Sequence, residues 1–346
     1  MERAPLLISK DKGSLDLLNS AKDLFSTHPI YIKEDSELVF VCGGAITSQK
    51  TSYRKHFLDA FKSFKFKKGL KLILSEKAFE TLTLANDFEP VNLIEFEELI
   101  AGIAFCVIIF IETPGAIAEL GYFCSKEVIC KKLLLVSDIA FNTTDSFINK
   151  GPIDVATTIF RSKFGQIIYL PKITQKNKKN FDFSGVLSVI NSKISAHDRR
   201  KRFEYSKAFK KTNKSKNNKQ HLFELEELFA VLEVINLFQI ITQKDLMFVF
   251  ERIFGVKRID HKKLVWVITL LAGSGFIKLS LDKNNVDLCI FKNKKFETFF
   301  QLEHSSKDIT PKNFSSLSDY GNLQVEIRSF YAIRRPDLLK QWEELE

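Results

Sequence analysis

The first half of the chain alternates short, wholly apolar runs with longer segments in which apolar residues recur at helical spacing. Runs of strand length lie at 38–42, 70–75, 105–111, 133–137 and 166–170. Helical spacing is found in 53–64, 92–104 and 116–124, and Asn92 is suited to cap the second of these helices. Strands that are apolar throughout must be covered on both faces, so this pattern predicts an α/β fold with a parallel sheet flanked by helices.

The second half of the chain has a different pattern. Helical spacing spans 223–238, 243–254 and 261–272, and two apolar runs at 276–281 and 286–291 then flank a polar turn. Three helices followed by a β-hairpin are the order of an α+β winged-helix domain. We therefore expect five parts: an N-terminal helical extension (1–36), the α/β domain (37–172), a basic linker with a short helix (173–220), a winged-helix-like domain (221–303) and a C-terminal helical tail (304–346).

The charge of the chain favours an acidic partner. The net charge is +10, which suits nucleic acid or an anionic surface. A dense basic run opens with Arg199, Arg200, Lys201 and Arg202 and continues to Lys219. This run is either a solvated tether between domains or an arm that contacts nucleic acid, because blocks of like charge serve both uses.

Composition also predicts the compartment. The longest uncharged apolar run, 99–111, has 13 residues, whereas a membrane-spanning helix needs about 20. The apolar stretch near the N-terminus, Leu6 to Ile8, is too short for a signal peptide. The five cysteines and six histidines show no metal-ligand spacing. We expect a cytoplasmic protein with free thiols, no structural metal and no membrane contact.

The segment 110–123 carries the most informative chemistry. A strand ends at Ile111, Pro114 suits a first helical turn, and Gly115 allows a ligand to approach the backbone. Glu119 then lies one to two turns into the helix, where the helix dipole favours its ionised form. An ionised carboxylate at this edge of a sheet can attack an anomeric carbon or stabilise an oxocarbenium ion. The alternative is an ordinary helix residue that faces solvent.

The motif Glu112-Thr-Pro-Gly-x-x-x-Glu119-Leu-Gly resembles that of the nucleoside deoxyribosyltransferase-like fold. Val41-Cys42-Gly43-Gly44, Phe96-Glu97 and Ser146-Phe-Ile-Asn149 occur around it in the order found in bacterial retron effectors of the nucleoside deoxyribosyltransferase-like plus winged-helix type. The motifs cover roughly 37–170. The resemblance to 221–300 rests on element order alone.

The resemblance implies a set of site residues, of which Glu119 is the nucleophile or the oxocarbenium stabiliser. It implies that Gly43 and Gly44 form the floor under a phosphate or ribose, that Arg54 meets a phosphate, and that Glu97 and Asn149 hold the substrate. Each has a plainer alternative as a turn, a surface charge or a loop cap. The substrate-binding set implied is Cys42, Gly43, Gly44, Arg54, Glu97, Glu112, Pro114, Gly115 and Asn149.

The sequence lacks one residue that would serve as a general acid, and this absence bears on which substrate the site could use. Phe105 and Cys106 leave no Asp at the start of the third strand of this fold. A substrate with a cationic leaving group, such as NAD, needs no general acid, so we expect NAD as a possible substrate and no cofactor. The competing hypothesis is a non-catalytic, nucleotide-sensing DNA-binding regulator. A P-loop and a Rossmann fingerprint are both missing from the sequence.

The resemblance also implies a role in antiphage defence. A retron effector is a toxin restrained by the retron reverse transcriptase and its hybrid of RNA and multicopy single-stranded DNA, and such a complex is oligomeric. Lys262 and Lys263 open the helix that would read nucleic acid, and Lys278 lies on the expected wing. Winged helices also serve as protein-binding modules, so the sequence leaves both roles open.

Overall fold

A computed structural model describes most of the chain as two compact units. The described residues are 12–27, 30–32, 37–46, 52–67, 70–76, 92–142, 145–174, 176–178, 181–195, 202–203, 225–254, 261–281, 288–292, 300–302 and 315–344. One unit comprises 34–77 with 89–199, and the other comprises 1–33, 78–88 and 200–346. Each unit is described by itself below.

The first unit is built on a five-stranded sheet in the order β3-β2-β4-β5-β6. All four neighbouring pairs run parallel. The strands are β2 (Glu37–Cys42), β3 (Leu70–Ile73), β4 (Cys106–Ile111), β5 (Leu133–Asp138) and β6 (Ile168–Leu170). The expected parallel α/β sheet is confirmed, and its two central strands β2 and β4 are buried along their whole length.

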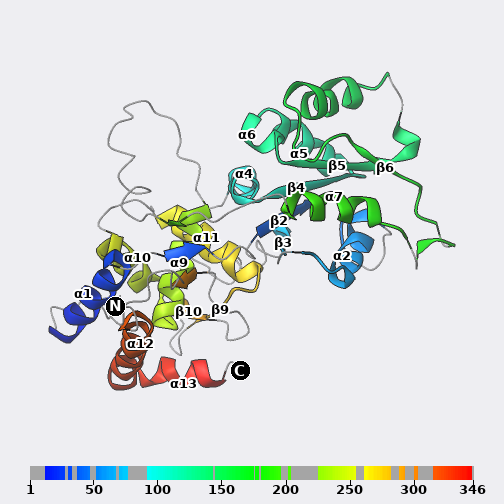
Figure 1. Ribbon diagram of the computed structural model, residues 1–346. Helices are drawn as coiled ribbons and strands as arrows, with labels where there is room; N and C mark the ends of the chain where they lie inside the picture. The colour runs from blue at the N-terminus through cyan, green and yellow to red at the C-terminus, as the bar shows by residue number, and fades with distance from the viewer. Residues whose placement is uncertain are drawn as a thin grey trace. The chain divides into compact units, whose positions relative to one another are not determined.

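Helices cover both faces of this sheet (Figure 1). On one face lie α2 (Tyr53–Ser63) and α7 (Ser184–Ser195), and on the other lie α4 (Leu93–Ile103), α5 (Pro114–Cys124) and α6 (Glu127–Cys130). The short helical turns η2 (Ile139–Phe141), η3 (Asn149–Ile153) and η4 (Val155–Ile159) follow β5. Asn92 caps α4 as expected, because its Oδ1 accepts from the Ile94 N–H at 3.0 Å.

The alternation of side chains along the strands decides which residues meet which helices. Val39 and Val41 of β2 belong to the core formed with α2 and α7. Phe40, between them, points to the other face and packs edge-on against Phe123 of α5, with ring centroids 6.3 Å apart. Cys42 therefore faces α5 as well, which becomes important for the site. The helix expected near 186–194 is α7, and its apolar residues belong to this same core.

The second unit has a small antiparallel sheet in the order β8-β10-β9. Its elements are α9 (Leu225–Phe238), β8 (Ile240–Thr242), α10 (Gln243–Phe254), α11 (His261–Gly273), β9 (Ile277–Leu281) and β10 (Leu288–Lys292). The three helices and the pairing of β9 with β10 agree with the sequence analysis. Strand β8 was not predicted from the sequence; its last residue, Thr242, also caps α10 by accepting from the Asp245 N–H at 3.1 Å.

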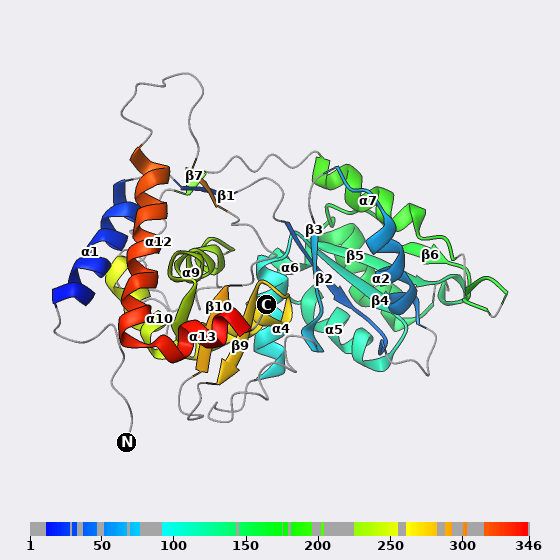
Figure 2. The same cartoon turned by 90° about the horizontal axis from the view of Figure 1, so that it is seen from below.

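The two ends of the chain complete the second unit. Helix α1 (Lys12–Thr27) packs against α10 and α12 (Ser315–Arg334), and α13 (Pro336–Glu344) follows α12 (Figure 2). A second small antiparallel sheet, which the sequence did not predict, joins β1 (Ile30–Ile32) to β7 (Arg202–Phe203) and β11 (Phe300–Leu302). Within the described residues, no helix is both long enough and apolar enough to cross a membrane.

Candidate active site

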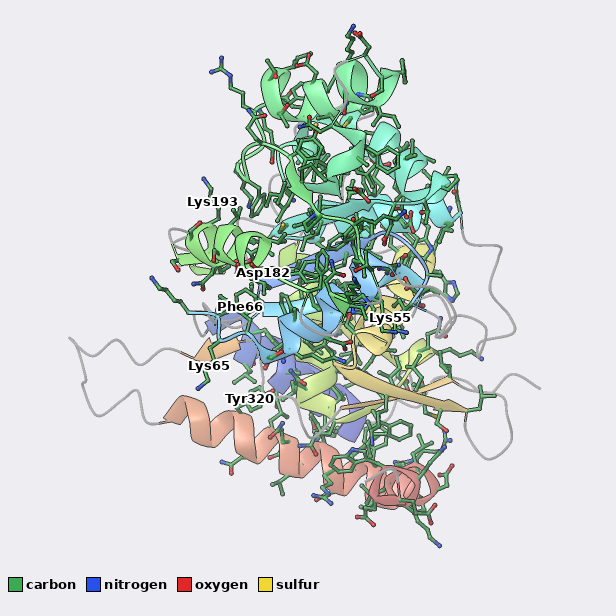
Figure 3. The ribbon with its side chains drawn as sticks, turned by 90° about the vertical axis from the view of Figure 1, so that its right-hand side faces the viewer. Lys55, Lys65, Phe66, Asp182, Lys193 and Tyr320 are labelled. Carbon is green, nitrogen blue, oxygen red and sulfur yellow. The ribbon has the colours of Figure 1, made fainter. Side chains whose placement is uncertain are left out.

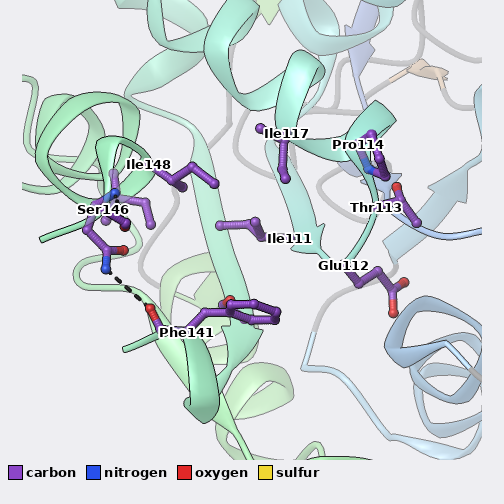
Figure 4. Close-up of a pocket in the computed structure, with 11 residues that line it drawn as sticks. Ile111, Glu112, Thr113, Pro114, Ile117, Phe141, Ser146 and Ile148 are labelled. Atoms are coloured by element: carbon purple, nitrogen blue, oxygen red, sulfur yellow. Dashed lines mark hydrogen bonds between the residues drawn. The ribbon is translucent and has the colours of Figure 1, made fainter. Parts of the chain in front are cut away.

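The N-terminus of α5 lies directly after the central strand β4. Thr113 caps the helix, with its Oγ1 accepting from the Ala116 N–H at 3.2 Å, and Pro114 occupies the first turn as expected. Because side chains alternate along an extended segment, Ile111 and Glu112 point to opposite faces of the sheet, as Figure 4 shows. The end of β4 therefore contributes to two different environments, one on each side.

Glu112 holds the glycine loop that follows β2. Its Oε1 accepts from the N–H groups of Gly44 at 2.8 Å and Arg54 at 3.3 Å, and its Oε2 accepts from the Tyr53 N–H at 2.7 Å. A Cβ on Gly44 would lie 2.9 Å from Glu112 Oε1, and one on Gly43, where φ is +151°, would lie 3.0 Å from the Cβ of Phe110. At both positions a side chain would crowd these neighbouring atoms, and at Gly43 the positive φ also favours glycine.

Glu119 lies against the end of β2 on the α5 side. The Cys42 thiol, which is 2% exposed, donates a hydrogen bond to the Glu119 carboxylate. Glu119 is itself half-buried, and its Oε2 is buried without a hydrogen-bond partner among the described residues. A buried carboxylate oxygen with no partner is costly, so this atom is available to a ligand that reaches it.

The surroundings of Glu119 favour its neutral form. Burial, first, and the negative charge of Glu97, second, raise its pKa from 4.5 to about 7, although Arg54 and the Cys42 thiol act in the opposite direction. Desolvation thus acts on Glu119 in the direction opposite to the helix dipole, which favours the ionised carboxylate.

Two more carboxylates and one arginine complete this cluster. Burial also raises the pKa of Glu97, against the effects of a hydrogen bond from Ser75 and of the Arg54 charge. The Arg54 side chain is 6% exposed and its Nη2 lies 2.7 Å from Glu76 Oε2. The sequence analysis missed Glu76 and Ser75, although both follow β3 at the same carboxyl edge of the sheet where ligands bind.

The structure thus brings Cys42, Arg54, Glu97 and Glu119 together, and it places Gly43, Gly44 and Glu112 in the adjoining loop. We call Cys42, Arg54, Glu76, Glu97 and Glu119 the carboxylate cluster. Gly115 is exposed at the start of α5. A Cβ added to it would have Thr113 Oγ1 as its nearest neighbour, at 4.0 Å, so the space beside this residue is open. In the described part of the chain, no three His, Cys, Asp or Glu side chains are grouped as metal ligands would be.

Pro114 and Asn149 line a separate pocket of about 200 Å³ on the other side of α5 (Figure 4). Its walls are mainly apolar and include Ile111, Ile117, Phe141 and Ile148, while the polar residues that line it are Glu112, Thr113, Ser137, Ser146 and Asn149. Asn149 closes one side by donating from Nδ2 to the Phe141 carbonyl at 3.2 Å. Glu119 does not line this pocket, because it is two residues from Ile117 and so lies on nearly the opposite side of the helix.

Comparison with known proteins agrees with the motifs in this site. The family model described as STM3845 retron effector protein matches residues 50–279, about two thirds of the chain. The chain belongs to this retron effector family. The match begins just before α2 and ends within β9, so it includes most of the carboxylate cluster and the helices α9, α10 and α11 of the second unit.

Two Escherichia coli proteins are similar to this retron effector. One, named "Retron Ec86 putative ribosyltransferase/DNA-binding protein", is 34% identical over 115 residues, which cover 33% of the chain and 36% of that protein. The protein of the same description from retron Ec73 is 24% identical over 279 residues, which cover 78% of the chain and 82% of that protein. The chain therefore matches about a third of the first relative's length and most of the second's.

Three of the basic residues expected to contact nucleic acid, Lys262, Lys263 and Lys278, are described and belong to the effector's second unit. Lys262 is exposed at the start of α11, with its Nζ 4.9 Å from the centre of the Trp266 ring. Lys263 is half-buried on the same helix, and Lys278 is exposed on β9. Arg199, Arg200 and Lys201 lie outside the described residues, and Arg202 is described only as part of the backbone of β7. The polar turn 282–285 also lies outside them.

Proposed function

We propose that this retron effector cleaves the N-glycosidic bond of NAD or a related nucleotide, with Glu119 acting at the sugar carbon C1′. The setting of Glu119 carries the proposal. The carboxylate of Glu119 is half-buried, accepts a hydrogen bond from the Cys42 thiol and has one oxygen without a partner among the described residues. It adjoins a glycine loop at the carboxyl edge of a parallel sheet. The names of the two relatives, which include ribosyltransferase, support the same class of reaction.

The proposed reaction takes place at Glu119 Oε2, the carboxylate oxygen without a hydrogen-bond partner among the described residues. The ionised Glu119 carboxylate forms a bond to C1′, or stabilises the positive charge that develops there, while the C1′–N bond breaks and its electron pair leaves with the base. Water then attacks C1′, displaces Glu119 as a free carboxylate, leaves its hydroxyl group on the sugar and releases its second proton to solvent. Nicotinamide leaves as a neutral molecule because it is cationic in NAD, so that substrate requires no proton donor.

Glu97 extends the proposal to neutral bases. The sequence provides no Asp at the start of β4, but the fold places Glu97 close enough for its charge to act on Glu119. The raised pKa of Glu97 favours its protonated form, and a protonated carboxyl can donate to a departing purine or pyrimidine. Purine and pyrimidine nucleotides therefore belong among the test substrates.

The neighbouring residues have separate roles in this proposal. Gly43 and Gly44 form the floor for the sugar or phosphate, and Gly115 leaves the start of α5 open to it. Glu112 orders that floor by accepting from three backbone N–H groups, and it also lines the pocket that contains Pro114 and Asn149. Arg54 balances the negative charge of the carboxylate cluster through Glu76. Pro114 and Asn149 bind a part of the substrate that reaches beyond α5.

Family membership extends the proposal to the whole protein. We infer a nucleoside deoxyribosyltransferase-like first unit and a winged-helix second unit that uses Lys262, Lys263 and Lys278 on DNA. The second role is supported by the term DNA-binding in the names of both relatives. The effector acts as an antiphage toxin in the cytoplasm, in an oligomeric complex where the reverse transcriptase and the RNA–DNA hybrid restrain it until infection.

The decisive experiment is an assay of the purified effector with NAD and with purine and pyrimidine nucleotides, read by the masses of the products. The wild type is expected to release the base. Glu119→Gln is expected to do so at least about 100-fold more slowly, since loss of a nucleophile removes the covalent step. Glu127→Gln, an exposed glutamate of the same unit, is the matched control and should retain full activity. Each protein is assayed alone and with its retron partners.

The second candidate is a non-catalytic nucleotide sensor. It is favoured by the apolar pocket that Glu119 does not line. In that case the nucleotide would bind without turnover, and wild type and Glu119→Gln would both leave every substrate intact under all conditions of the assay. Release of a free base by the wild type alone excludes the sensor.

A further inference from the structure

The end of α2 and the loop after it alternate lysine with phenylalanine. The sequence Phe61-Lys62-Ser63-Phe64-Lys65-Phe66-Lys67 leaves Lys62, Lys65 and Lys67 exposed, while Phe64 and Phe66 are half-buried. The Phe66 ring packs on both neighbours, with centroids 4.6 Å from Phe61 and 4.7 Å from Phe64. Phe64 and Phe66 also pack against the core shared with α2 and α7, so the two rings are anchored, partly exposed and next to exposed lysines in the chain.

Helix α7 adds a further lysine beside this loop. The Lys67 N–H donates to Asn191 Oδ1 at 2.9 Å, which joins the loop to α7. Lys193, two residues further along α7, is exposed. Figure 3 shows Lys65, Phe66 and Lys193 on these two neighbouring elements. We call Lys62, Lys65, Lys67 and Lys193, with Phe64 and Phe66, the lysine–phenylalanine surface.

Within the described residues of this loop and of α7, few acidic side chains offset these lysines, and Asp182 lies just before the start of α7. No Asp or Glu occurs between Asp59 and Glu76, and none occurs in α7. Asp59 lies 3.7 Å from Lys62, but both side chains are more than two thirds exposed, at 71% and 77%, and such a pair contributes little. The surface lies where α2 ends, while the carboxylate cluster lies where the strands end, so the two are at opposite edges of the sheet.

We propose that the lysine–phenylalanine surface binds the backbone of single-stranded nucleic acid. Lysines that neutralise phosphates release counterions and supply affinity without regard to sequence. Aromatic rings placed between them offer a face on which an unpaired base can stack, which a base inside a duplex cannot use. This inference is independent of the proposed enzymatic function, because it uses no residue of the carboxylate cluster or of the apolar pocket.

The test uses the full chain and a fluorescent 30-nucleotide oligo(dT) as the probe. The variant Lys62→Gln/Lys65→Gln/Lys67→Gln/Lys193→Gln is expected to bind about 500-fold more weakly at 0.1 M salt. Its slope of log affinity against log salt should fall by about 3, since each lost phosphate contact on a single strand contributes about 0.7. The control, Lys12→Gln/Lys22→Gln/Lys131→Gln/Lys150→Gln, removes the same charge from exposed lysines elsewhere and should stay within twofold of wild type.

Two results would overturn the proposal. One is an unchanged affinity and slope in the surface variant. The other is equal weakening in the surface and control variants, which would show that net charge alone attracts the probe.

A second variant tests the preference for single strands. Phe66→Leu retains an apolar side chain but removes the ring, so it should weaken binding to oligo(dT) at least threefold and leave binding to a 30-base-pair duplex unchanged. Circular dichroism melting of each variant confirms that it is folded. Equal losses for oligo(dT) and duplex, or none for either, would refute the stacking part of the proposal.

Discussion

At the scale of single residues, the central feature is a carboxylate whose charge is disfavoured by its surroundings. Glu119 is half-buried next to Glu97, and its pKa of about 7 means that both protonation states are populated near neutral pH. The ionised form is the one that can act on C1′, so the fold destabilises the reactive state. A cationic substrate would lower this pKa again and favour the ionised form on binding.

The raised pKa predicts that Glu119 makes stability depend on pH. The folded state holds the proton more tightly than the unfolded chain, so the contribution to stability is complete below pH 4.5 and is lost as the pH rises through about 7. Glu119→Gln removes this dependence, because the amide stays neutral and still accepts from Cys42. We expect the variant to be more stable than wild type by roughly 2 kcal/mol at pH 8 and nearly equal at pH 5.

Thermal melting of both proteins at pH 5, 6, 7 and 8 measures this difference. Glu127→Gln serves as the control, because that residue is exposed and pairs with Lys131 on the surface. A difference between Glu119→Gln and wild type that stays constant over the whole range would show that Glu119 does not titrate there.

At the scale of elements, the carboxyl edge of the sheet is held together by the side chain of Glu112, the residue that follows β4. Glu112 connects the glycine loop after β2 to the start of α2 by accepting from three backbone N–H groups. Such groups at a helix start have no partners within the helix, and a carboxylate there also interacts favourably with the helix dipole. The loop that would support a nucleotide is thus ordered before any ligand arrives.

This arrangement predicts a large effect for Glu112→Ala. Leaving three half-buried N–H groups without their acceptor is expected to cost about 3 kcal/mol in the unfolding free energy of the first unit. Urea unfolding followed by far-ultraviolet circular dichroism measures the loss, and hydrogen exchange should show faster exchange at Gly44 and Tyr53. Glu127→Ala should change the free energy by less than about 0.5 kcal/mol. A similar small change for Glu112→Ala would mean that water replaces the carboxylate at no cost.

At the scale of the whole molecule, the second unit is assembled from both ends of the chain. Helix α1 packs on α10, and the buried Phe25 ring meets Phe254 edge-on with centroids 5.6 Å apart. The unit therefore depends on a segment that precedes the α/β sheet in the chain.

We predict that Phe25→Ala destabilises the second unit alone, by about 3–5 kcal/mol for a buried ring. Trp266 and Trp342, the two tryptophans of the chain, both belong to this unit, so their fluorescence in urea reports its unfolding selectively. The exposed Leu15 of the same helix provides the control Leu15→Ala, with little expected effect. Equal loss of protection from hydrogen exchange in β2, β4 and β5 would contradict the independence of the two units.

Local features explain why much of the fold was predictable. Strand-length apolar runs predicted all five parallel strands, and Asn92 and Thr242 predicted two helix starts, because burial and capping act within a few residues. The pairing of β1 with β7 and β11 was not predictable, since those strands are two or three residues long and are separated by more than 90 residues of chain.

Local patterns in the sequence were enough to identify residues that could carry the chemistry: Glu119 after Pro114 and Gly115, the Gly43–Gly44 turn, and Glu97 ahead of β4. Their combination depends on contacts between distant parts of the chain. These contacts hold Glu112 on the glycine loop while it also lines the pocket with Ile111, and they bring Glu76 to Arg54 and Glu97 toward Glu119. The charge state and the partner of each side chain depend on burial and on neighbours distant in sequence, and these exist only once the sheet has formed.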